Sequence, residues 1–413
     1  MTTSRADRSW GTLTGIILLW QVTASITFYA IYAIPPFVQA DFDVGATQIG
    51  VMITALMLGY TLFLVPIGGI IDVYGESRVL VIGLVGLGVG VVGVALAPTF
   101  LVLLVVVFVV GTFYATAIPG TNKAVFAAIP AERLNTSMGI KQVGVTAGSG
   151  LSAIVIPWFG ASRFGWEVGV VLLAVVALVV SVVFRVLYGP SEEVAGRDRG
   201  GIRSHFRTTE YTLLTAAGFF LGAALFTTMG YTILYVDQSV GAGVVFAGLA
   251  LASAQLFGSI GRVVFGWLAD RLSAPLTVST LRILILQATA AALLFLVVTV
   301  VDTPLLALGL FGALGFFIFG FTGIYYSCIG SLVPTEEMGS ATAGGQLALN
   351  FGALGAPAAF GWIVDGPGYG VAWPMLALCS LFALGLLVVI AVRVRQSAAA
   401  PGGSDREYAS GQQ

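Results

Sequence analysis

The chain has 413 residues, of which 58% are hydrophobic and only 9% are charged. An ordinary soluble domain carries about 25% charged residues, so this composition excludes a water-soluble globular protein. The apolar residues also gather in long runs, since residues 79–97, 98–122 and 343–364 contain no charged side chain. Uncharged runs of about 18 residues or more are typical of helices that span a membrane. The formal net charge is −1, and the sequence has no basic patch of the kind that binds nucleic acid.

The hydropathy pattern predicts an all-α membrane protein with twelve transmembrane helices. Each span needs about 20 apolar residues, and a backbone exposed to lipid must satisfy its own hydrogen bonds, which an α-helix does. In chain order, the spans are expected at 11–34, 47–71, 79–97, 100–126, 137–158, 168–188, 211–235, 243–268, 276–300, 304–331, 341–363 and 372–394.

The distribution of lysine and arginine predicts the orientation. An even number of spans puts both termini on one side, and the loops of that side include Arg78, Arg133 and Arg271. In the loops of the opposite side, Arg163 is the only lysine or arginine. Because loops rich in Lys and Arg stay in the cytoplasm, we expect a multi-pass protein of the cell membrane with both termini cytoplasmic.

The chain divides into two similar halves. The charged stretch 189–210 predicts a cytoplasmic linker between a six-helix half at 1–188 and another at 211–395, and the polar tail 396–413 is expected to be disordered. Three landmarks recur at an offset of about 200 residues, as is typical of transporters built from repeats. They are Gly68-Gly-Ile-Ile-Asp72 with Gly266-Trp-Leu-Ala-Asp270, Ile129-Pro with Val333-Pro, and Met138-Gly with Met338-Gly.

The loop after the second span carries the most specific motif. Gly68, Asp72 and Gly75 match the pattern Gly-x-x-x-Asp-basic-x-Gly-basic-basic of the major facilitator superfamily, which the chain resembles over its whole length, and the basic Arg78 directly follows these ten positions. The chain departs from that pattern at Val73, Glu76 and Ser77, the three positions at which the pattern has a basic residue. The resemblance implies the fold of that superfamily, with two halves related by a pseudo-two-fold axis normal to the membrane, and transport by alternating access.

The repeated Gly-to-Asp segment is expected to form a gate. Its members are Gly68, Asp72, Gly75 and Arg78 in the first copy, and Gly266, Asp270 and Arg271 in the second. Asp72 and Asp270 end helices on the cytoplasmic side, where a carboxylate can pair with Arg78 or Arg271 or face the N-terminus of a neighbouring helix. In the superfamily, the contact helps to hold the cytoplasmic side closed. The alternative is that both are solvated loop charges.

Polar side chains form stripes inside several spans. Residues four apart lie on one helical face, and this spacing holds for Gln21, Ser25 and Tyr29, for Gln346 and Asn350, and for Thr227 and Tyr231. Such stripes indicate helices that line a water-filled path. The same residue types also join helices by hydrogen bonds, which is the alternative for each of them. As candidate substrate-binding residues, these stripes supply Tyr29, Tyr231, Gln346 and Asn350.

Arg262 is the deepest cation of the chain, eight residues before Asp270 and on one face with Gln255 and Ser259. A charge at such depth is costly and is a functional candidate by default. We expect Arg262, Gln255 and Ser259 to bind substrate, although Arg262 could instead pair with a carbonyl or another polar group. Lys141 is a second candidate, but it lies only one turn inside its span and could reach the interface, as we expect for Lys123.

No Asp or Glu lies in the middle of a span. Cationic side chains inside the spans without acidic side chains beside them predict a small organic anion, such as a carboxylate, as the substrate. The segments from Gly139 to Gly144 and from Gly261 to Asp270 also resemble bacterial cyanate-permease-like, oxalate/formate and monocarboxylate-type carriers. The alternative within the superfamily is an exporter of drugs, sugars or other neutral metabolites.

A membrane enzyme or sensor is a different class of function, which the sequence disfavours. The single histidine, His205, lies in the linker, and no soluble domain is attached. We therefore expect no catalytic residues, metal or cofactor. We expect a monomer whose partners are the lipid bilayer, a small-molecule substrate and, if transport is coupled, an ion that the sequence does not identify.

Overall fold

The computed structural model describes residues 9–190, 208–334 and 337–399. Within these ranges every regular element is helical, and twelve spans are long and apolar enough to cross a membrane. Each end of these spans lies within three residues of its predicted position. The prediction of an all-α protein with twelve transmembrane helices is therefore confirmed.

The first six spans come from the part of the chain before residue 190. Their helices, with two short 3-10 turns (η2, η3) and the short helix α2, are α1 Trp10–Tyr29, η2 Ala30–Tyr32, α2 Pro35–Phe42, α3 Ala46–Tyr74, α4 Glu76–Ala95, α5 Phe100–Tyr114, α6 Ala117–Ala128, η3 Ala131–Arg133, α7 Leu134–Gly160 and α8 Trp166–Tyr188. The sequence analysis did not anticipate α2, which begins at the Pro35-Pro36 pair. Proline suits the first turn of a helix, where its missing N–H has no partner to lose.

The last six spans follow residue 208. Their helices are α9 Thr209–Gln238, α10 Val244–Arg271, α11 Leu276–Val298, α12 Pro304–Leu314, the π-turn η5 Gly315–Phe319, α13 Phe321–Gly330, α14 Met338–Asp365 and α15 Tyr369–Ala399. Most of the predicted linker 189–210 and of the predicted tail 396–413 lies outside the described residues.

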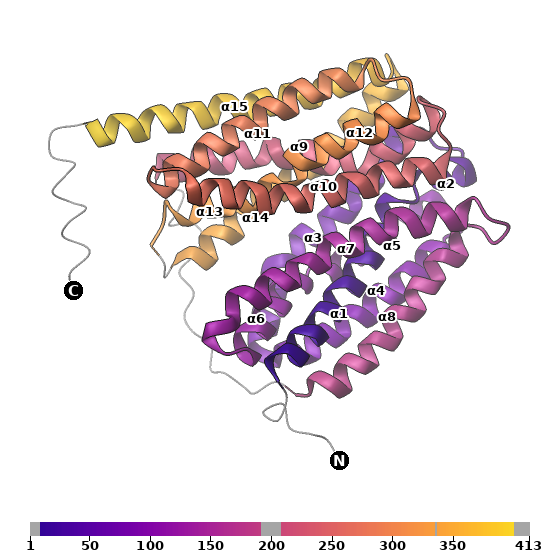
Figure 1. The fold of residues 1–413 in the computed structure, drawn as a ribbon. Coiled ribbons are helices and arrows are strands. Elements are labelled where there is room, and N and C mark those ends of the chain that lie inside the picture. The colour runs from indigo at the N-terminus through magenta and orange to yellow at the C-terminus, as the bar shows by residue number, and fades with distance from the viewer. Residues whose placement is uncertain (1–8, 191–207, 335–336, 400–413) are drawn as a thin grey trace.

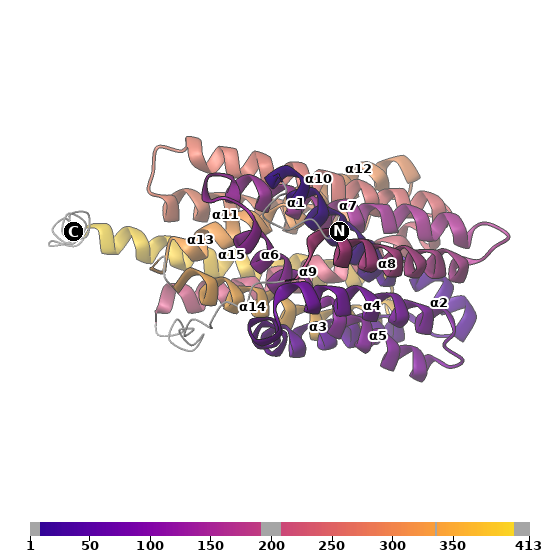
Figure 2. The ribbon, with the colours of Figure 1, turned by 90° about the horizontal axis from the view of Figure 1, so that it is seen from below.

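The helices form two groups in space. Helices α1 to α8 lie together, as do α9 to α15, and the groups meet near α2 but diverge toward the end that carries both termini (Figure 1). The view from below likewise shows α2 and the C-terminal end of α15 at opposite ends of the molecule (Figure 2). We call the end with the termini the terminus side and the end with α2 the far side.

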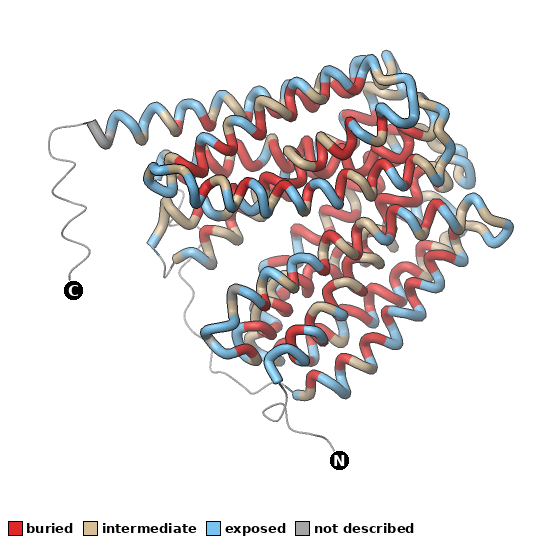
Figure 3. Tube along the Cα trace, in the orientation of Figure 1, coloured by how far each residue is buried: buried red, intermediate tan, exposed pale blue. Residues whose placement is uncertain are grey.

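Buried residues concentrate where helices face one another, and exposed residues cover the outside of the bundle (Figure 3). Many exposed side chains are large and apolar, including Leu62 at 56%, Val182 at 63% and Val263 at 73%. A soluble protein rarely exposes so much apolar surface, whereas a bilayer covers it. The outer surface therefore fits the hydrocarbon core of a membrane.

Two spans are interrupted near the middle of the molecule. Helix α5 ends at Tyr114 and α6 begins at Ala117, because Pro119 has no N–H to donate to the carbonyl four residues earlier. The tenth span contains η5, in which the N–H of Gly320 bonds the carbonyl of Gly315 at 3.1 Å. Such π-turns occur often at functional sites. Both interruptions lie beside the candidate site.

Candidate substrate-binding cavity and gates

A cavity of about 130 Å³ lies between the two groups of helices. The first group contributes Phe28, Tyr29, Tyr60, Tyr114, Ile118, Gln142, Val145, Thr146 and Ser149 to its wall. The second group contributes Gly222, Leu225, Phe226, Met229, Gln255, Arg262, Phe319, Phe321, Thr322, Tyr326, Gln346 and Leu349. A larger hollow of about 460 Å³ lies on the outside between α4 and α5, but its wall is wholly apolar. The central cavity is therefore the candidate site for a polar solute.

Among the residues that the structure describes, Arg262 is the only charged one in the wall of this cavity. Its Nε donates a hydrogen bond to the carbonyl oxygen of Phe319 at 3.1 Å. Its two terminal nitrogens form no hydrogen bond to any residue that the structure describes. The phenol groups of Tyr29 and Tyr326 lie near enough to interact with its charge. One edge of the guanidinium is thus anchored to the protein, and the other edge remains available to a ligand.

Close packing of α10 against the tenth span places Arg262 at the cavity. A Cβ atom at Gly261 would lie 2.2 Å from the carbonyl oxygen of Phe316, and one at Gly315 would lie 2.1 Å from that of Ala254. Real Cβ atoms do not approach so closely, so only glycine permits the two backbones to touch here. The contact brings Arg262 beside the backbone carbonyl of Phe319 in η5.

Polar groups surround Arg262. The side chain of Gln255 is 5% exposed, and its Nε2 has no hydrogen-bond partner among the described residues. The hydroxyl of Tyr326 donates to the Oε1 of Gln346, whose Nε2 donates to the Oδ1 of Asn350 at 2.8 Å. An unpaired amide donor and a free guanidinium edge can both bind an anionic group.

The structure brings together four of the eight predicted binding residues. Arg262, Gln255, Gln346 and Tyr29 line the cavity. The other four lie elsewhere in this conformation. Ser259 donates to the backbone carbonyl of Gln255, and the buried Asn350 accepts a hydrogen bond from Gln346. The hydroxyl of Tyr231 donates to the carbonyl of Ala46 on the far side. Lys141 donates to the side chain of Asn122.

Aromatic rings form much of the first group's wall, which the sequence analysis did not identify. Phe28 and Tyr114 stack with ring centroids 3.8 Å apart, and Tyr60 lies 5.5 Å from Tyr114. The hydroxyl of Tyr114 lies 3.3 Å from that of Ser25. One feature of the sequence could have indicated this wall. Tyr114 lies in the middle of an uncharged span, close to Pro119, which interrupts the helix.

The far side is closed by contacts between the two groups of helices. The hydroxyl of Tyr231 lies 2.7 Å from the carbonyl oxygen of Ala46 and 2.9 Å from that of Pro357. Thr54 donates to the carbonyl of Leu354 at 2.8 Å. A Cβ at Gly50 would lie 2.3 Å from the carbonyl oxygen of Pro357, so α3 and α14 pack backbone to backbone.

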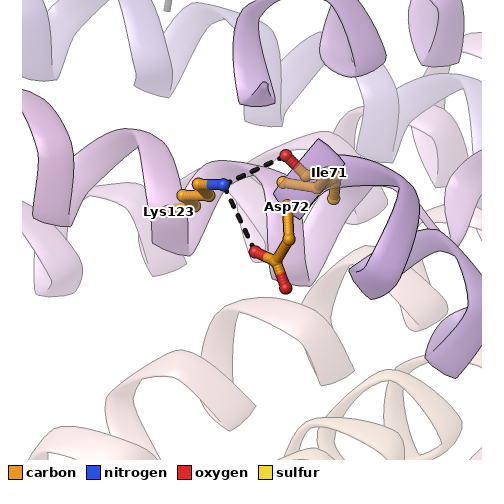
Figure 4. A network of polar contacts seen from close by, with 3 residues as sticks. All are labelled: Ile71, Asp72 and Lys123. Carbon is orange, nitrogen blue, oxygen red and sulfur yellow. Dashed lines mark hydrogen bonds and ion pairs between the residues drawn. The ribbon is translucent and has the colours of Figure 1, made fainter. Parts of the chain in front are cut away.

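On the terminus side, Asp72 pairs with Lys123, a partner that the sequence analysis did not consider. The Nζ of Lys123 lies 3.2 Å from the Oδ1 of Asp72 and donates to the carbonyl of Ile71 at 3.0 Å (Figure 4). Both residues belong to the first group. The expectation that Lys123 extends alone to the membrane interface is replaced by this ion pair.

The other gate residues take separate positions. Gly75 has a φ of 80°, which favours glycine, and it forms the turn from α3 to α4. Arg78 is exposed, and so is Asp270, which forms no hydrogen bond or ion pair within the described residues. The guanidinium of Arg271 lies 4.1 Å from the ring centroid of Trp267. Gly266 has open space around it.

Comparison with known proteins gives the family. The sequence pattern of the Major Facilitator Superfamily matches residues 17–357. The chain belongs to the Major Facilitator Superfamily. Members of this superfamily are secondary transporters that bind small solutes within the membrane, so the chain is a transporter of this kind.

Relatives within the superfamily cover most of the chain. The hexuronate transporter of Bacillus subtilis (strain 168) is 23% identical over 350 residues, which are 81% of this chain and 83% of the relative. The D-galactonate transporter of Escherichia coli O6:H1 (strain CFT073) is 22% identical over 383 residues, 84% of this chain and 86% of the relative. The crystal structure of a mutant of the nucleoside transporter NupG superposes with a TM-score of 0.78 at 12% identity, covering 92% of this chain and 99% of NupG.

The motifs of the superfamily retain their place in this fold. The segment from Gly68 to Arg78 connects α3 to α4 on the terminus side, and Gly266 to Arg271 ends α10 on the same side. Two of the three departures from the family pattern, Glu76 and Ser77, form structural contacts, whereas Val73 is exposed. Buried Glu76 accepts a hydrogen bond from the hydroxyl of Tyr188 at 3.0 Å, and Ser77 donates to the carbonyl of Gly189 at 2.5 Å. These contacts tie the start of α4 to the end of α8.

Proposed function

We propose that this transporter carries a small organic anion with a carboxylate group across the cell membrane by alternating access. The observation that supports this most is Arg262, whose guanidinium is the only charge in the wall of the central cavity. A planar guanidinium suits a carboxylate, because two parallel N–H groups can donate to its two oxygens. No acidic side chain lines the cavity to neutralise Arg262 in place of the cargo.

The neighbouring side chains would orient the anion. The amide of Gln255 has an unused donor, and the hydroxyl of Tyr29 lies near Arg262. On the opposite wall, Gln142, Thr146 and Ser149 of α7 present polar groups to the rest of the solute. Two of the relatives are named for the transport of a hexuronate and of D-galactonate, which are hydroxylated carboxylates. Such compounds fit a wall with a cation on one side and neutral polar groups on the other.

Alternating access fits the distribution of contacts. On the far side the groups of helices touch through Tyr231, Thr54 and Gly50, whereas the Asp72–Lys123 pair joins residues of one group only. If the termini are cytoplasmic, as the Lys/Arg bias predicts, this conformation is open toward the cytoplasm. The residues from Gly68 to Arg78 and from Gly266 to Arg271 would then re-form contacts when the cytoplasmic side closes.

Ligand screening by thermal unfolding tests the proposal. A solute that binds only the folded protein raises its apparent stability by about 2.7 kcal/mol at 100 times its Kd. We expect D-glucuronate, D-galactonate or another carboxylate of a panel to stabilise the purified protein, and uptake of the labelled compound into proteoliposomes to follow. Stabilisation by the uncharged galactose or mannitol, with no response to any anion, would contradict the proposal.

The alternative is an exporter of drugs, sugars or other neutral metabolites. The aromatic wall formed by Phe28, Tyr60 and Tyr114 favours it, since such rings bind apolar faces of many compounds. In that case the bond from Arg262 to the Phe319 carbonyl would be structural. The same screen separates the two candidates, because only the carrier of an anion responds to charge.

A further inference from the structure

The chain contains two lysines, and they differ in their surroundings. Lys123 has the carboxylate of Asp72 at 3.2 Å. Lys141 is 2% exposed, and its Nζ donates to the neutral amide oxygen of Asn122 in α6 at 2.6 Å. This is its only hydrogen bond within the described part of the chain. An ammonium group has three donors, so two of them are unused.

No described anion compensates the charge of Lys141. Helix α7 packs against α1, α6, α8, α10, η2 and η3. The charged and titratable residues of these elements are Tyr29 of α1, Lys123 of α6, Glu167, Arg185 and Tyr188 of α8, Arg262, Asp270 and Arg271 of α10, Tyr32 of η2, and Glu132 and Arg133 of η3. None of them forms an ion pair with Lys141. A buried charge without a partner is costly, so a lysine in this position changes its charge state readily.

A chain of polar side chains connects the neighbourhood of Lys141 to the cavity. One turn along α7, Gly144 packs against α1, where an added Cβ would lie 3.0 Å from the Cβ of Gln21. The Oε1 of Gln21 accepts from Thr121, the residue before Asn122, at 3.2 Å, and its Nε2 donates to Ser25 at 3.1 Å. The chain continues from Ser25 to the hydroxyl of Tyr114, in the cavity wall.

We propose that Lys141 is the proton-binding site of this transporter, which would then move its anion together with a proton. The inference rests on the proposed function only for the identity of the cargo. Water on the side to which the carrier is open supplies one proton to the neutral Nζ, which forms an N–H bond and becomes an ammonium. The same proton leaves to water on the other side, after the anion has crossed, and the amine is restored. A monovalent anion and one proton cross with no net charge.

The coupling between the two binding events would be electrostatic, because no hydrogen bond within the described residues links the polar chain to Lys141 or to Arg262. A negative charge beside Arg262 favours the ammonium form of Lys141, and the ammonium favours the anion in return, as reciprocal coupling requires. No carboxylate lines the cavity, so the role that an acidic residue often has in proton-coupled carriers falls to a base here. Lys123 differs from Lys141 in its surroundings, since its Nζ lies 3.2 Å from the carboxylate oxygen of Asp72.

Nuclear magnetic resonance of the lysine side chains tests the proton site without any substrate. Protein labelled with ¹³C,¹⁵N-lysine and held in nanodiscs gives only two side-chain signals, which Lys123→Arg and Lys141→Arg assign by deletion. We expect the Lys141 signal to change from ammonium to amine as the pH is raised through the range in which the carrier works, which a site that binds and releases protons requires. The Lys123 signal serves as the internal reference for chemical shift. A Lys141 signal that does not titrate in this range would overturn the proposal.

A transport assay tests the coupling. With D-galactonate as the probe, wild-type proteoliposomes that contain a pH-sensitive dye should acidify inside as the anion enters. Lys141→Met should still exchange labelled for unlabelled D-galactonate, but with at least a tenfold smaller proton signal, and Lys123→Arg should keep that signal. A full proton signal in Lys141→Met would overturn the proposal. If the wild type does not transport D-galactonate, that cargo is wrong, and the resonance titration still decides the proton site.

Discussion

Asp365 and Thr47 join the last turn of α14 to the first turn of α3. The Oδ2 of Asp365 accepts a hydrogen bond from the backbone N–H of Thr47 at 2.8 Å and another from its hydroxyl. The Oδ1 accepts from the backbone N–H of Ala46, also at 2.8 Å. A carboxylate at the N-terminus of a helix is stabilised by the helix dipole and by the unpaired N–H groups of the first turn. This contact therefore holds the two groups of helices together on the far side.

Replacing Asp365 with Asn should favour opening of the far side. The amide keeps the shape of the side chain but loses the charge, which contributes about 0.3–1 kcal/mol at an exposed helix N-terminus. A loss of this size changes the ratio of the two conformations by about 2- to 5-fold. Spin labels on the loops at 96–99 and 299–303, measured by double electron–electron resonance, should show a larger fraction of long distances in Asp365→Asn.

Asp302→Asn is the matched control for this experiment. Asp302 is also an exposed carboxylate on the far side, in the loop before α12, but within the described residues it forms no hydrogen bond or ion pair with the first group of helices. Its substitution should leave the distance distribution unchanged. Equal distributions in wild type and Asp365→Asn would show that the contact does not set the conformation.

The sequence was sufficient for the membrane fold, because hydropathy is a local property. The run 98–122 lacks charge whatever its neighbours are, so its span follows from composition alone. The turn from α3 to α4 is also a local feature, since Gly75 has a positive φ, a conformation that glycine adopts easily. The contact of Asp365 with Thr47 is different. It joins residues more than 300 positions apart, and their approach depends on how α3 and α14 pack through Gly50.

Asp72 and Asp270 should govern the transport cycle more than binding. Replacing either with Asn should slow transport but leave the Kd of the solute within a few-fold, because both lie on the terminus side and outside the cavity wall. Asp72 pairs with Lys123. Exchanging the two charges, with Asp72→Lys and Lys123→Asp in one variant, should therefore restore part of the transport rate that either substitution alone removes. Kd values from the thermal unfolding screen and initial rates in proteoliposomes separate the two effects. Loss of binding in the Asn variants would contradict a gating role.

The candidate site could be predicted only in part. Arg262, Gln255, Gln346 and Tyr29 were identifiable because polar groups are rare inside spans. Ser259 and Asn350 share the predicted helical faces but bond within their own helices, so a face shows which side is polar and not which residues a solute can reach. The Phe28–Tyr114 stack combines two spans, and aromatic residues are too common in membrane helices to reveal a binding wall.

Both termini should lie in the cytoplasm. The loops on the terminus side carry nearly all the loop arginines, whereas Arg163 is alone on the far side. A reporter that is fluorescent only in the cytoplasm, fused after Arg395, should therefore be active, and alkaline phosphatase fused there should be inactive. Fusion of the same reporters at Ser162 in the far-side loop should give the opposite pair of results. Activity of alkaline phosphatase after Arg395 would invert the topology and would turn the open side of this conformation outward.

The last prediction concerns Arg262, whose free guanidinium edge faces the cavity. Lysine at this position keeps the charge but cannot donate two parallel hydrogen bonds to a carboxylate. We expect Arg262→Lys to raise the Kd of the best anion at least tenfold, which corresponds to about 1.4 kcal/mol, and Arg262→Ala to abolish binding. Binding is measured by thermal unfolding and by equilibrium dialysis with the labelled anion.

A matched control and a fold check make the Arg262 result decisive. Arg282 is an exposed arginine of α11, in the same group of helices but outside the cavity wall, so Arg282→Ala should bind the anion normally. Arg262→Ala loses the bond to the Phe319 carbonyl, so its fold is checked by size-exclusion chromatography and by its unfolding temperature without ligand. Arg262→Gln retains a donor for that carbonyl and should also fail to bind, because the charge is missing. Near wild-type affinity in either folded variant would make Arg262 structural and would favour the exporter of neutral compounds.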